Sequence, residues 1–149
     1  MAPALPANPW LIAGGILSAI GALLHLAVIA GGPGWYRFFG AGERLARMAE
    51  QGQARPALFA IGIALLLAVA AAYAFAGAGL IPRLPLMRTA LLAISSVYLL
   101  RGLGGWALLA SRTDLSCAFM LWSSVIVTGF GVAYAVGTWR AWPVLSAAG

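Results

Sequence analysis

The sequence has no lysine, one cysteine, one histidine and only three acidic residues. A single cysteine excludes an internal disulfide and a metal site built on thiolates. With one histidine and no cluster of carboxylates in the apolar runs, the sequence predicts no metal site. Charged residues make up 8% of the chain, against about 25% in soluble domains. This shortage of charge is typical of a membrane protein and argues against a soluble domain.

Four apolar runs are long enough to cross a bilayer as helices, which takes about 20 residues each. They cover residues 10–30, 56–79, 86–110 and 115–139. Backbone polar groups in hydrocarbon must be satisfied within their own segment, which predicts that the runs are helices. The predicted fold class is therefore all-α: an integral membrane four-helix bundle that forms a single domain over residues 1–149.

The loop between the first two spans is the one long connection, and it predicts a short amphipathic helix over residues 41–52. Glu43, Arg47 and Glu50 share one face at helical spacing, and Glu43 to Arg47 has the favoured orientation for a helix ion pair. The opposite face is apolar (Leu45, Met48 and Ala49). We expect this helix to lie in the membrane interface.

The distribution of arginine predicts the orientation. Five of the nine arginines lie in the first and third loops, and three lie at the opposite ends of the spans. The positive-inside rule then places the first and third loops in the cytoplasm and both termini in the periplasm, in a bacterial inner membrane. The net charge of +6 does not predict a nucleic-acid partner, because the arginines are spread over the membrane edges. Anionic lipid head groups of the bilayer are the nearer partner for them.

His25 extends a face of small residues on the first predicted helix, after Gly14, Ser18, Gly21 and Ala22. Small residues let helices approach each other in lipid, so His25 is expected to face the bundle. Two interpretations stay open: a hydrogen bond to a neighbouring helix, or a role in proton transfer or ligand contact.

Arg101 lies inside the third predicted span, with Tyr98 three residues earlier on the same face. A charge at membrane depth is costly and usually faces a cavity or a partner. Alternatively, the helix ends near Gly102–Gly105, and Arg101 extends its side chain to the inner interface. Ser124, in the fourth span, belongs to a stripe with Thr128 and Gly131 that we interpret as packing contacts.

His25, Arg101 and the first loop all belong to the predicted cytoplasmic end, where they could form one polar site. Such a site suits a lipid-like or amphipathic anionic ligand, with its tail between helices and its head group on arginine. No cofactor is expected. The predicted ligand-binding residues are His25, Arg37, Glu43, Arg44, Arg47, Glu50, Tyr98 and Arg101.

Two segments carry a first resemblance: "GGPGWYRFFGAGERLARMAEQG" and "LPLMRTALLAISSVYLLRG". They resemble a group of small bacterial inner-membrane proteins. This resemblance implies four spans and no particular activity.

The stretch "ERLARMAEQ", followed by "RPALFA", resembles the first-loop signature of the MAPEG family of membrane glutathione transferases and leukotriene synthases. Glu43, Arg44 and Arg47 match that signature, whereas Gln51 replaces an asparagine and Ala54 replaces a glutamate. The resemblance implies a trimer of four-helix chains that binds glutathione between subunits. Arg101 and Tyr98 could correspond to the arginine and tyrosine that this family uses in its later helices.

Three classes of function follow from the sequence. The chain binds or transports an amphipathic ligand, or it is a MAPEG-like glutathione-dependent enzyme, or it is a structural subunit of a larger membrane complex. The sequence leaves open whether the protein is an enzyme and whether it forms a homo-oligomer.

Overall fold

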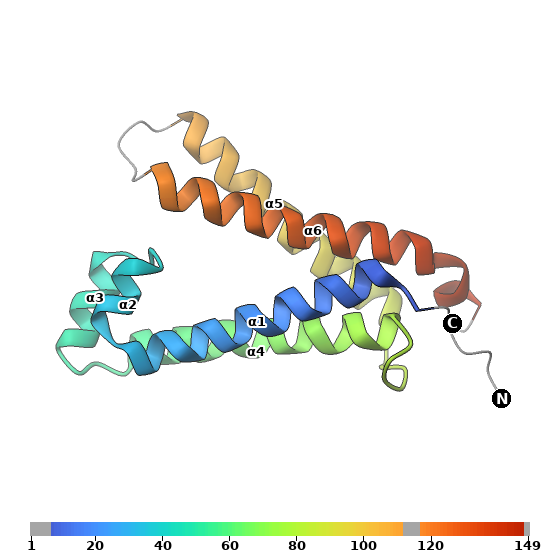
Figure 1. Ribbon diagram of the computed structural model, residues 1–149, viewed down its shortest axis with the longest axis horizontal. Helices are drawn as coiled ribbons and strands as arrows, with labels where there is room; N and C mark the ends of the chain where they lie inside the picture. Colours follow the sequence, from blue (N-terminus) through green and yellow to red (C-terminus); the bar gives the residue numbers. More distant parts are fainter. Residues whose placement is uncertain (1–6, 112–116, 148–149) are drawn as a thin grey trace. The chain divides into compact units, whose positions relative to one another are not determined.

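The fold is described by a computed structural model that covers residues 7–111 and 117–147, without the side chains of residues 117–119. All regular structure in these residues is helical (Figure 1). The helices are α1 (Pro9–Gly31), α2 (Pro33–Phe38), α3 (Glu43–Glu50), α4 (Arg55–Gly77), α5 (Met87–Ser111) and α6 (Cys117–Ser146). Helices α1, α4, α5 and α6 are long and apolar enough to cross a membrane. The predicted all-α class is confirmed, and the four apolar helices indicate a multi-pass membrane protein.

The fourth long helix differs most from its prediction. It was expected to end at residue 139, but α6 continues to Ser146 and includes Pro143. Proline inside a helix costs about 3 kcal/mol, because it lacks an amide donor and its ring crowds the preceding turn. Ala141 and Leu145 are both buried in the core on either side of Pro143. Their burial keeps the last turns helical.

The segment after α1 contains a short helix that the sequence analysis interpreted only as a break and an anchor. Gly32 has a φ of 69°, which reverses the chain after α1. Pro33 then takes the first position of α2, where its missing amide hydrogen has no helical partner to lose. The next helix, predicted over 41–52, is limited to Glu43–Glu50. Gly42 and Gly52 flank it with φ values of 96° and 69°, which no right-handed helix uses.

The described residues group into two compact units. Unit 1 contains the chain up to Ser18 and from Ala70 onward, and unit 2 contains Ala19–Val69. The boundaries lie within α1 and α4. The single domain predicted over residues 1–149 stays a prediction.

The core of unit 1 is built from a few large side chains set against small ones. Leu11, Leu91 and Tyr134 are fully buried. A Cβ atom at Gly14 would lie 2.9 Å from the ring of Tyr134, so the glycine is needed for this contact. Helices α5 and α6 pack along each other (Figure 1). Lipid tails are as apolar as leucine, so the hydrophobic effect does not drive helices together in a membrane. Close approach of helices at glycine is the packing expected there.

Unit 2 has a smaller core. Val28 of α1, Tyr36 of α2 and Ala46 of α3 are buried together. Phe39, Leu45 and Ala49 pack against them. Two residues of the predicted apolar face, Leu45 and Ala49, therefore cover this core, whereas Met48 is not part of it and the most buried residue of the helix is Ala46, which the prediction did not include.

Candidate functional site

A hydroxyl cluster in unit 1 joins α1, α5 and α6. The Ser18 Oγ atom lies 2.9 Å from the Tyr98 hydroxyl and 2.9 Å from the Tyr134 hydroxyl. Ser18 and Tyr134 are fully buried. Three hydroxyls carry three protons, and the two hydrogen bonds use two of them. The cluster thus holds one O–H group with no acceptor among the described residues.

Arg101 lies further along the same α5–α6 interface. Its Nη2 atom donates a hydrogen bond of 3.2 Å to the Ser123 hydroxyl. Its Nη1 atom lies 3.3 Å from the point that a Cβ at Gly105 would occupy. In the part of the chain that is described, Arg101 forms no ion pair with a carboxylate. The guanidinium has five donor hydrogens, and one has an assigned protein acceptor.

Ser124 lies against the same glycine. Its Oγ atom also contacts the Cβ position of Gly105, its side chain is fully buried, and it has no hydrogen-bond partner among the described residues. A buried polar atom without a partner costs about 1–3 kcal/mol. Thr128, one turn later, satisfies its own hydroxyl by donating to the Ser124 carbonyl at 2.6 Å. Ser124 was predicted to be a packing residue, and its unpartnered hydroxyl is a feature that the sequence did not reveal.

The length of α5 removes the helix end on which one of the two interpretations of Arg101 rested, and the environment of its side chain in a membrane stays a prediction. The helix does not end near Gly102–Gly105 but continues to Ser111. Arg101 is thus 14 residues after Met87 and 10 before Ser111, which is about 21 Å and 15 Å along the axis. The hydrocarbon core of a bilayer is about 30 Å thick. If α5 crosses the bilayer, the Cα atom of Arg101 lies in its middle third.

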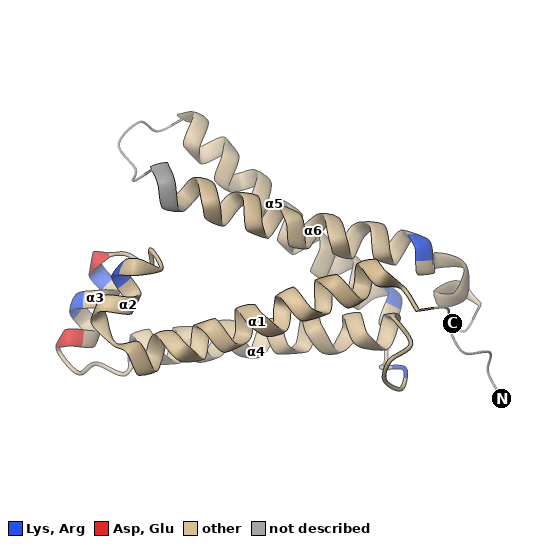
Figure 2. Ribbon diagram, in the orientation of Figure 1, with Lys and Arg blue, Asp and Glu red and all other residues tan. Residues whose placement is uncertain are grey.

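A second polar group lies on α2 and α3 in unit 2, where blue and red segments alternate (Figure 2). Arg37 is 2.8 Å from Glu43 and 2.8 Å from Glu50, and Arg47 is 3.1 Å from Glu43. The predicted Glu43–Arg47 pair is confirmed. We call these four residues the loop cluster. All four are exposed, so each pair contributes little to stability, but Arg37 connects α2 with both ends of α3.

The ion pairs of the loop cluster stabilise the charged forms of Glu43 and Arg37. Hydrogen bonds from Arg37 and Arg47 lower the pKa of Glu43 from 4.5 to about 2. Hydrogen bonds to Glu43 and Glu50 raise the pKa of Arg37 above its ordinary value. Burial raises the pKa of Tyr36, which lies beneath the cluster. The stabilisation from Glu43 is therefore complete above about pH 4.5 and is lost as the pH falls toward 2.

The pKa of Glu43 is expected to lie well below its usual value of 4.5, and removing Arg37 is expected to raise it. In Arg37→Gln the pKa of Glu43 should rise from about 2 toward 4.5. Carboxyl ¹³C NMR of glutamate-labelled protein measures this directly, because the chain has only two glutamates. Arg44→Gln is the matched control, since Arg44 forms no ion pair among the described residues and should leave Glu43 unchanged. Equal titration of Glu43 in wild type and Arg37→Gln would contradict the cluster.

His25 forms a local contact. Its Nδ1 atom lies 2.8 Å from the carbonyl oxygen of Gly21, four residues earlier on α1, so the ring nitrogen that donates is Nδ1–H. The side chain is half-buried. The Nδ1 hydrogen bond is therefore made within α1 itself, and both interpretations of His25, a hydrogen bond to a neighbouring helix or a role in proton transfer or ligand contact, stay predictions.

The predicted site residues fall into separate groups. Arg37, Glu43, Arg47 and Glu50 lie together in unit 2, which also contains His25 and Arg44. Tyr98 and Arg101 belong to unit 1. That His25 and Arg101 lie close together in one polar site stays a prediction. The sequence analysis missed Tyr134 and Ser123, and it treated Ser18 and Ser124 as packing residues.

Arg112, which is the arginine of the third loop, and Asp114, which is the third acidic residue, lie outside the described residues, as does the side chain of Cys117. Within the described residues no group of three potential metal ligands exists.

Comparisons with known proteins gave no match to a family model, to a curated protein or to a solved structure.

Proposed function

We propose that this multi-pass membrane protein binds an amphipathic anionic molecule, with the anionic group on Arg101. The observation that supports this most is Arg101 itself, an exposed guanidinium within an apolar helix that pairs with no carboxylate among the described residues. An oxyanion there would accept from Arg101 and from the Ser123 hydroxyl beside it.

The energetic argument concerns the charge. An arginine in a spanning helix is costly and is normally compensated by a partner or by water. Ser123 alone provides one neutral oxygen at 3.2 Å. A phosphate or carboxylate would provide a charge-assisted and bidentate partner, which is roughly twice as strong as a neutral one. Binding an anion therefore removes the cost of the uncompensated guanidinium.

The ligand class follows from the surroundings of Arg101 on α5. Val97, Leu100 and Leu103 are 63%, 72% and 57% exposed. Such side chains contact lipid tails in a membrane and would accept the apolar part of the same molecule. We propose a lipid-like ligand for this reason. The structure gives no observation that favours glutathione or a larger complex over it.

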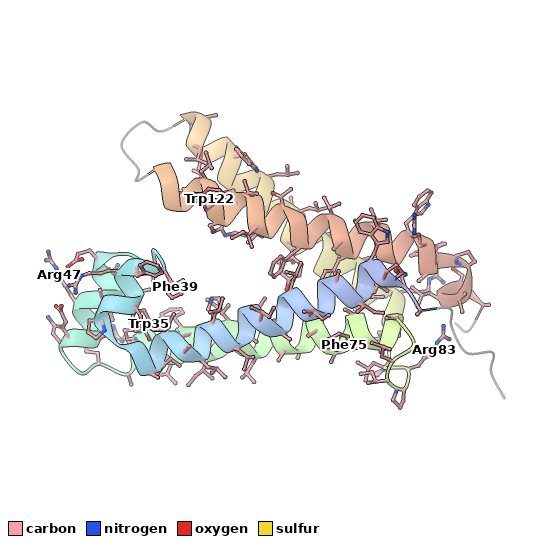
Figure 3. The ribbon with its side chains drawn as sticks, viewed as in Figure 1. Trp35, Phe39, Arg47, Phe75, Arg83 and Trp122 are labelled. Atoms are coloured by element: carbon pink, nitrogen blue, oxygen red, sulfur yellow. The ribbon has the colours of Figure 1, made fainter. Side chains whose placement is uncertain are left out.

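We also propose that α2 and α3 lie in the membrane interface. One residue separates α1 from α2, and four separate α3 from α4, so both short helices stay near the ends of two spanning helices. Trp35 of α2 is labelled in Figure 3 and packs with Phe39, at 5.7 Å between ring centres. Trp35 is 44% exposed and Phe38 is 79% exposed. Aromatic side chains of this kind anchor helices at the level of lipid head groups. With the arginine bias, this supports a cytoplasmic position for the first loop, in a bacterial inner membrane.

Binding to Arg101 is tested by native mass spectrometry of the purified chain with phosphatidylglycerol, using phosphatidylcholine as the uncharged comparison. Arg101→Ala is expected to retain one bound phosphatidylglycerol fewer than wild type. Binding at that site should be weaker by about tenfold or more, because a charge-assisted hydrogen bond contributes about 1.5–3 kcal/mol. Arg101→Lys should give an intermediate loss, since lysine keeps the charge but not the bidentate geometry.

Arg55→Ala removes an equal charge from an exposed position outside the predicted site and should bind like wild type. Identical phosphatidylglycerol binding by Arg101→Ala and wild type would overturn the proposal.

A further inference from the structure

A cavity at the opposite end of α5 contains two arginines. It has a volume of about 380 Å³ and is lined by residues 83–89 and by Leu145 of α6. Arg83 belongs to the turn between α4 and α5 and is labelled in Figure 3, and Arg88 is the second residue of α5. All of these residues belong to unit 1. Small-molecule pockets have volumes of about 300–1,000 Å³, so the cavity is large enough for a head group.

Both guanidinium groups are held in place without a carboxylate. Arg83 donates from Nη2 to the Val144 carbonyl at 2.9 Å. The Arg88 guanidinium lies 4.7 Å from the centre of the Trp142 ring, a cation–π contact. Neither forms an ion pair with a carboxylate among the described residues. Two positive charges thus line one cavity, and most of their donor hydrogens have no described acceptor.

The chain offers few carboxylates that could neutralise this cavity. Its acidic residues number three in all. Glu43 and Glu50 are already paired with arginines in unit 2. A third arginine, Arg140, lies 5.9 Å from the Trp10 ring and lines an adjacent cavity of about 190 Å³. Figure 2 shows blue segments and no red one at this end of unit 1.

The turn that carries Arg83 is stiff, which fixes the positions of the two arginines. Pro82 and Pro85 restrict its backbone. The Tyr73 hydroxyl donates to the Pro85 carbonyl at 3.0 Å and so attaches the turn to α4. Leu86 has a φ of 54°, a strained conformation for leucine that persists only where the surroundings impose it. A preorganised pair of guanidinium groups loses less conformational entropy when it binds an anion.

We propose that Arg83 and Arg88 form a second anion site, which binds the phosphate or carboxylate group of an amphipathic molecule. Guanidinium groups match the planar, bidentate geometry of these oxyanions. The Thr89 side chain lines the same cavity and provides a hydroxyl donor. Leu86 is 77% exposed and supplies an apolar surface for the rest of the ligand. Arg88 and Arg101 are 13 residues apart on α5, about 20 Å along the helix axis, so this site is separate from the one at Arg101.

The test on the wild-type chain uses phenylglyoxal, which modifies accessible arginines, with the modified positions mapped by mass spectrometry. Phosphatidylglycerol is expected to slow modification of Arg83 and Arg88 at least fivefold, while the exposed Arg55 serves as the unprotected internal control. Protection by phosphatidylglycerol but not by inorganic phosphate would identify a lipid head group as the ligand. Protection by both would identify a site for free oxyanions as well. If neither compound protects Arg83 and Arg88, the proposal is wrong.

Variants provide the second measurement. The double variant Arg83→Gln/Arg88→Gln is expected to bind phosphatidylglycerol at this site at least tenfold more weakly than wild type. The variant Arg55→Gln removes an exposed arginine of unit 2 that belongs to neither proposed site, and it should bind at Arg83 and Arg88 like wild type. Arg101→Ala should leave the protection of Arg83 and Arg88 unchanged, which separates the two sites. Wild-type affinity in Arg83→Gln/Arg88→Gln would overturn the proposal. If that variant does not fold, the protection experiment still decides.

Discussion

Replacing Gly102 with valine is expected to separate α5 from α6 and to lower the free energy of unfolding by about 3 kcal/mol, the upper part of the range for overpacked sites. A Cβ atom at this position would lie 2.8 Å from the Thr128 amide nitrogen and 2.9 Å from the Thr128 Cα atom. These are backbone atoms of the facing helix, so no side-chain rotation relieves the contact. SDS-induced unfolding in mixed micelles, followed by circular dichroism, measures the change.

Gly104 is a matched control two residues away on the same helix. A Cβ atom there meets nothing within 4 Å. Gly104→Ala should therefore unfold at the same SDS fraction as wild type or at a higher one, because alanine favours a helix over glycine by about 1 kcal/mol. Equal effects of Gly102→Val and Gly104→Ala would show that helix propensity, and not the α5–α6 contact, determines the result.

Truncating Tyr134 to alanine is expected to destabilise the chain by about 4 kcal/mol, as is typical of large aromatic residues in a core. The Tyr134 side chain is fully buried, its ring packs on Gly14 and on Tyr98, and its hydroxyl reaches Ser18. Tyr134→Phe keeps the ring and removes only the hydroxyl, so its loss should be about 1 kcal/mol. The difference between the two variants separates the contribution of the ring from that of the hydrogen bond.

Trp139→Ala is the comparison for Tyr134→Ala. Trp139 is on the same helix and is 76% exposed. Its removal should change the free energy of unfolding in detergent by less than about 1 kcal/mol, because a surface substitution leaves no cavity. The Tyr134 prediction fails if Tyr134→Ala and Trp139→Ala destabilise the chain equally.

The short helices show how far local sequence could predict the fold. Glu43 and Arg47 stand four residues apart, and this spacing alone predicted their ion pair. Arg37 and Glu50 belong to different helices, and their contact depends on the path of the chain through Gly40 and Gly42, which both have positive φ. A helix of six residues such as Pro33–Phe38 is too short to leave a periodic pattern, so its sequence indicated only a break.

The candidate site was predicted in part. Arg101 and Tyr98 were selected because polar groups in an apolar run are costly and therefore conspicuous. Ser18 and Tyr134 were not selected, since serine in such a run is equally suited to helix packing. Their contacts join residues 80 and 116 positions apart, and no local pattern indicates such a pair. The Thr128 hydroxyl has a hydrogen-bond acceptor and the Ser124 hydroxyl has none among the described residues. This difference is a property of the three-dimensional arrangement and leaves no trace in the sequence.

The sequence by itself determined the class of fold and the four helices that are long and apolar enough to span a membrane, because the exclusion of charge from hydrocarbon is a property of composition and run length. It also determined where most of the charge would collect, since apart from Arg101 the arginines and glutamates lie in loops, in the short helices or near the ends of long helices. Only the tertiary structure decided that α5 continues past Arg101, that Ser124 lies without a partner beside it, and that Arg83 and Arg88 share one cavity. These features depend on contacts between helices, which are set by shape and by hydrogen-bond geometry and not by hydrophobic pattern.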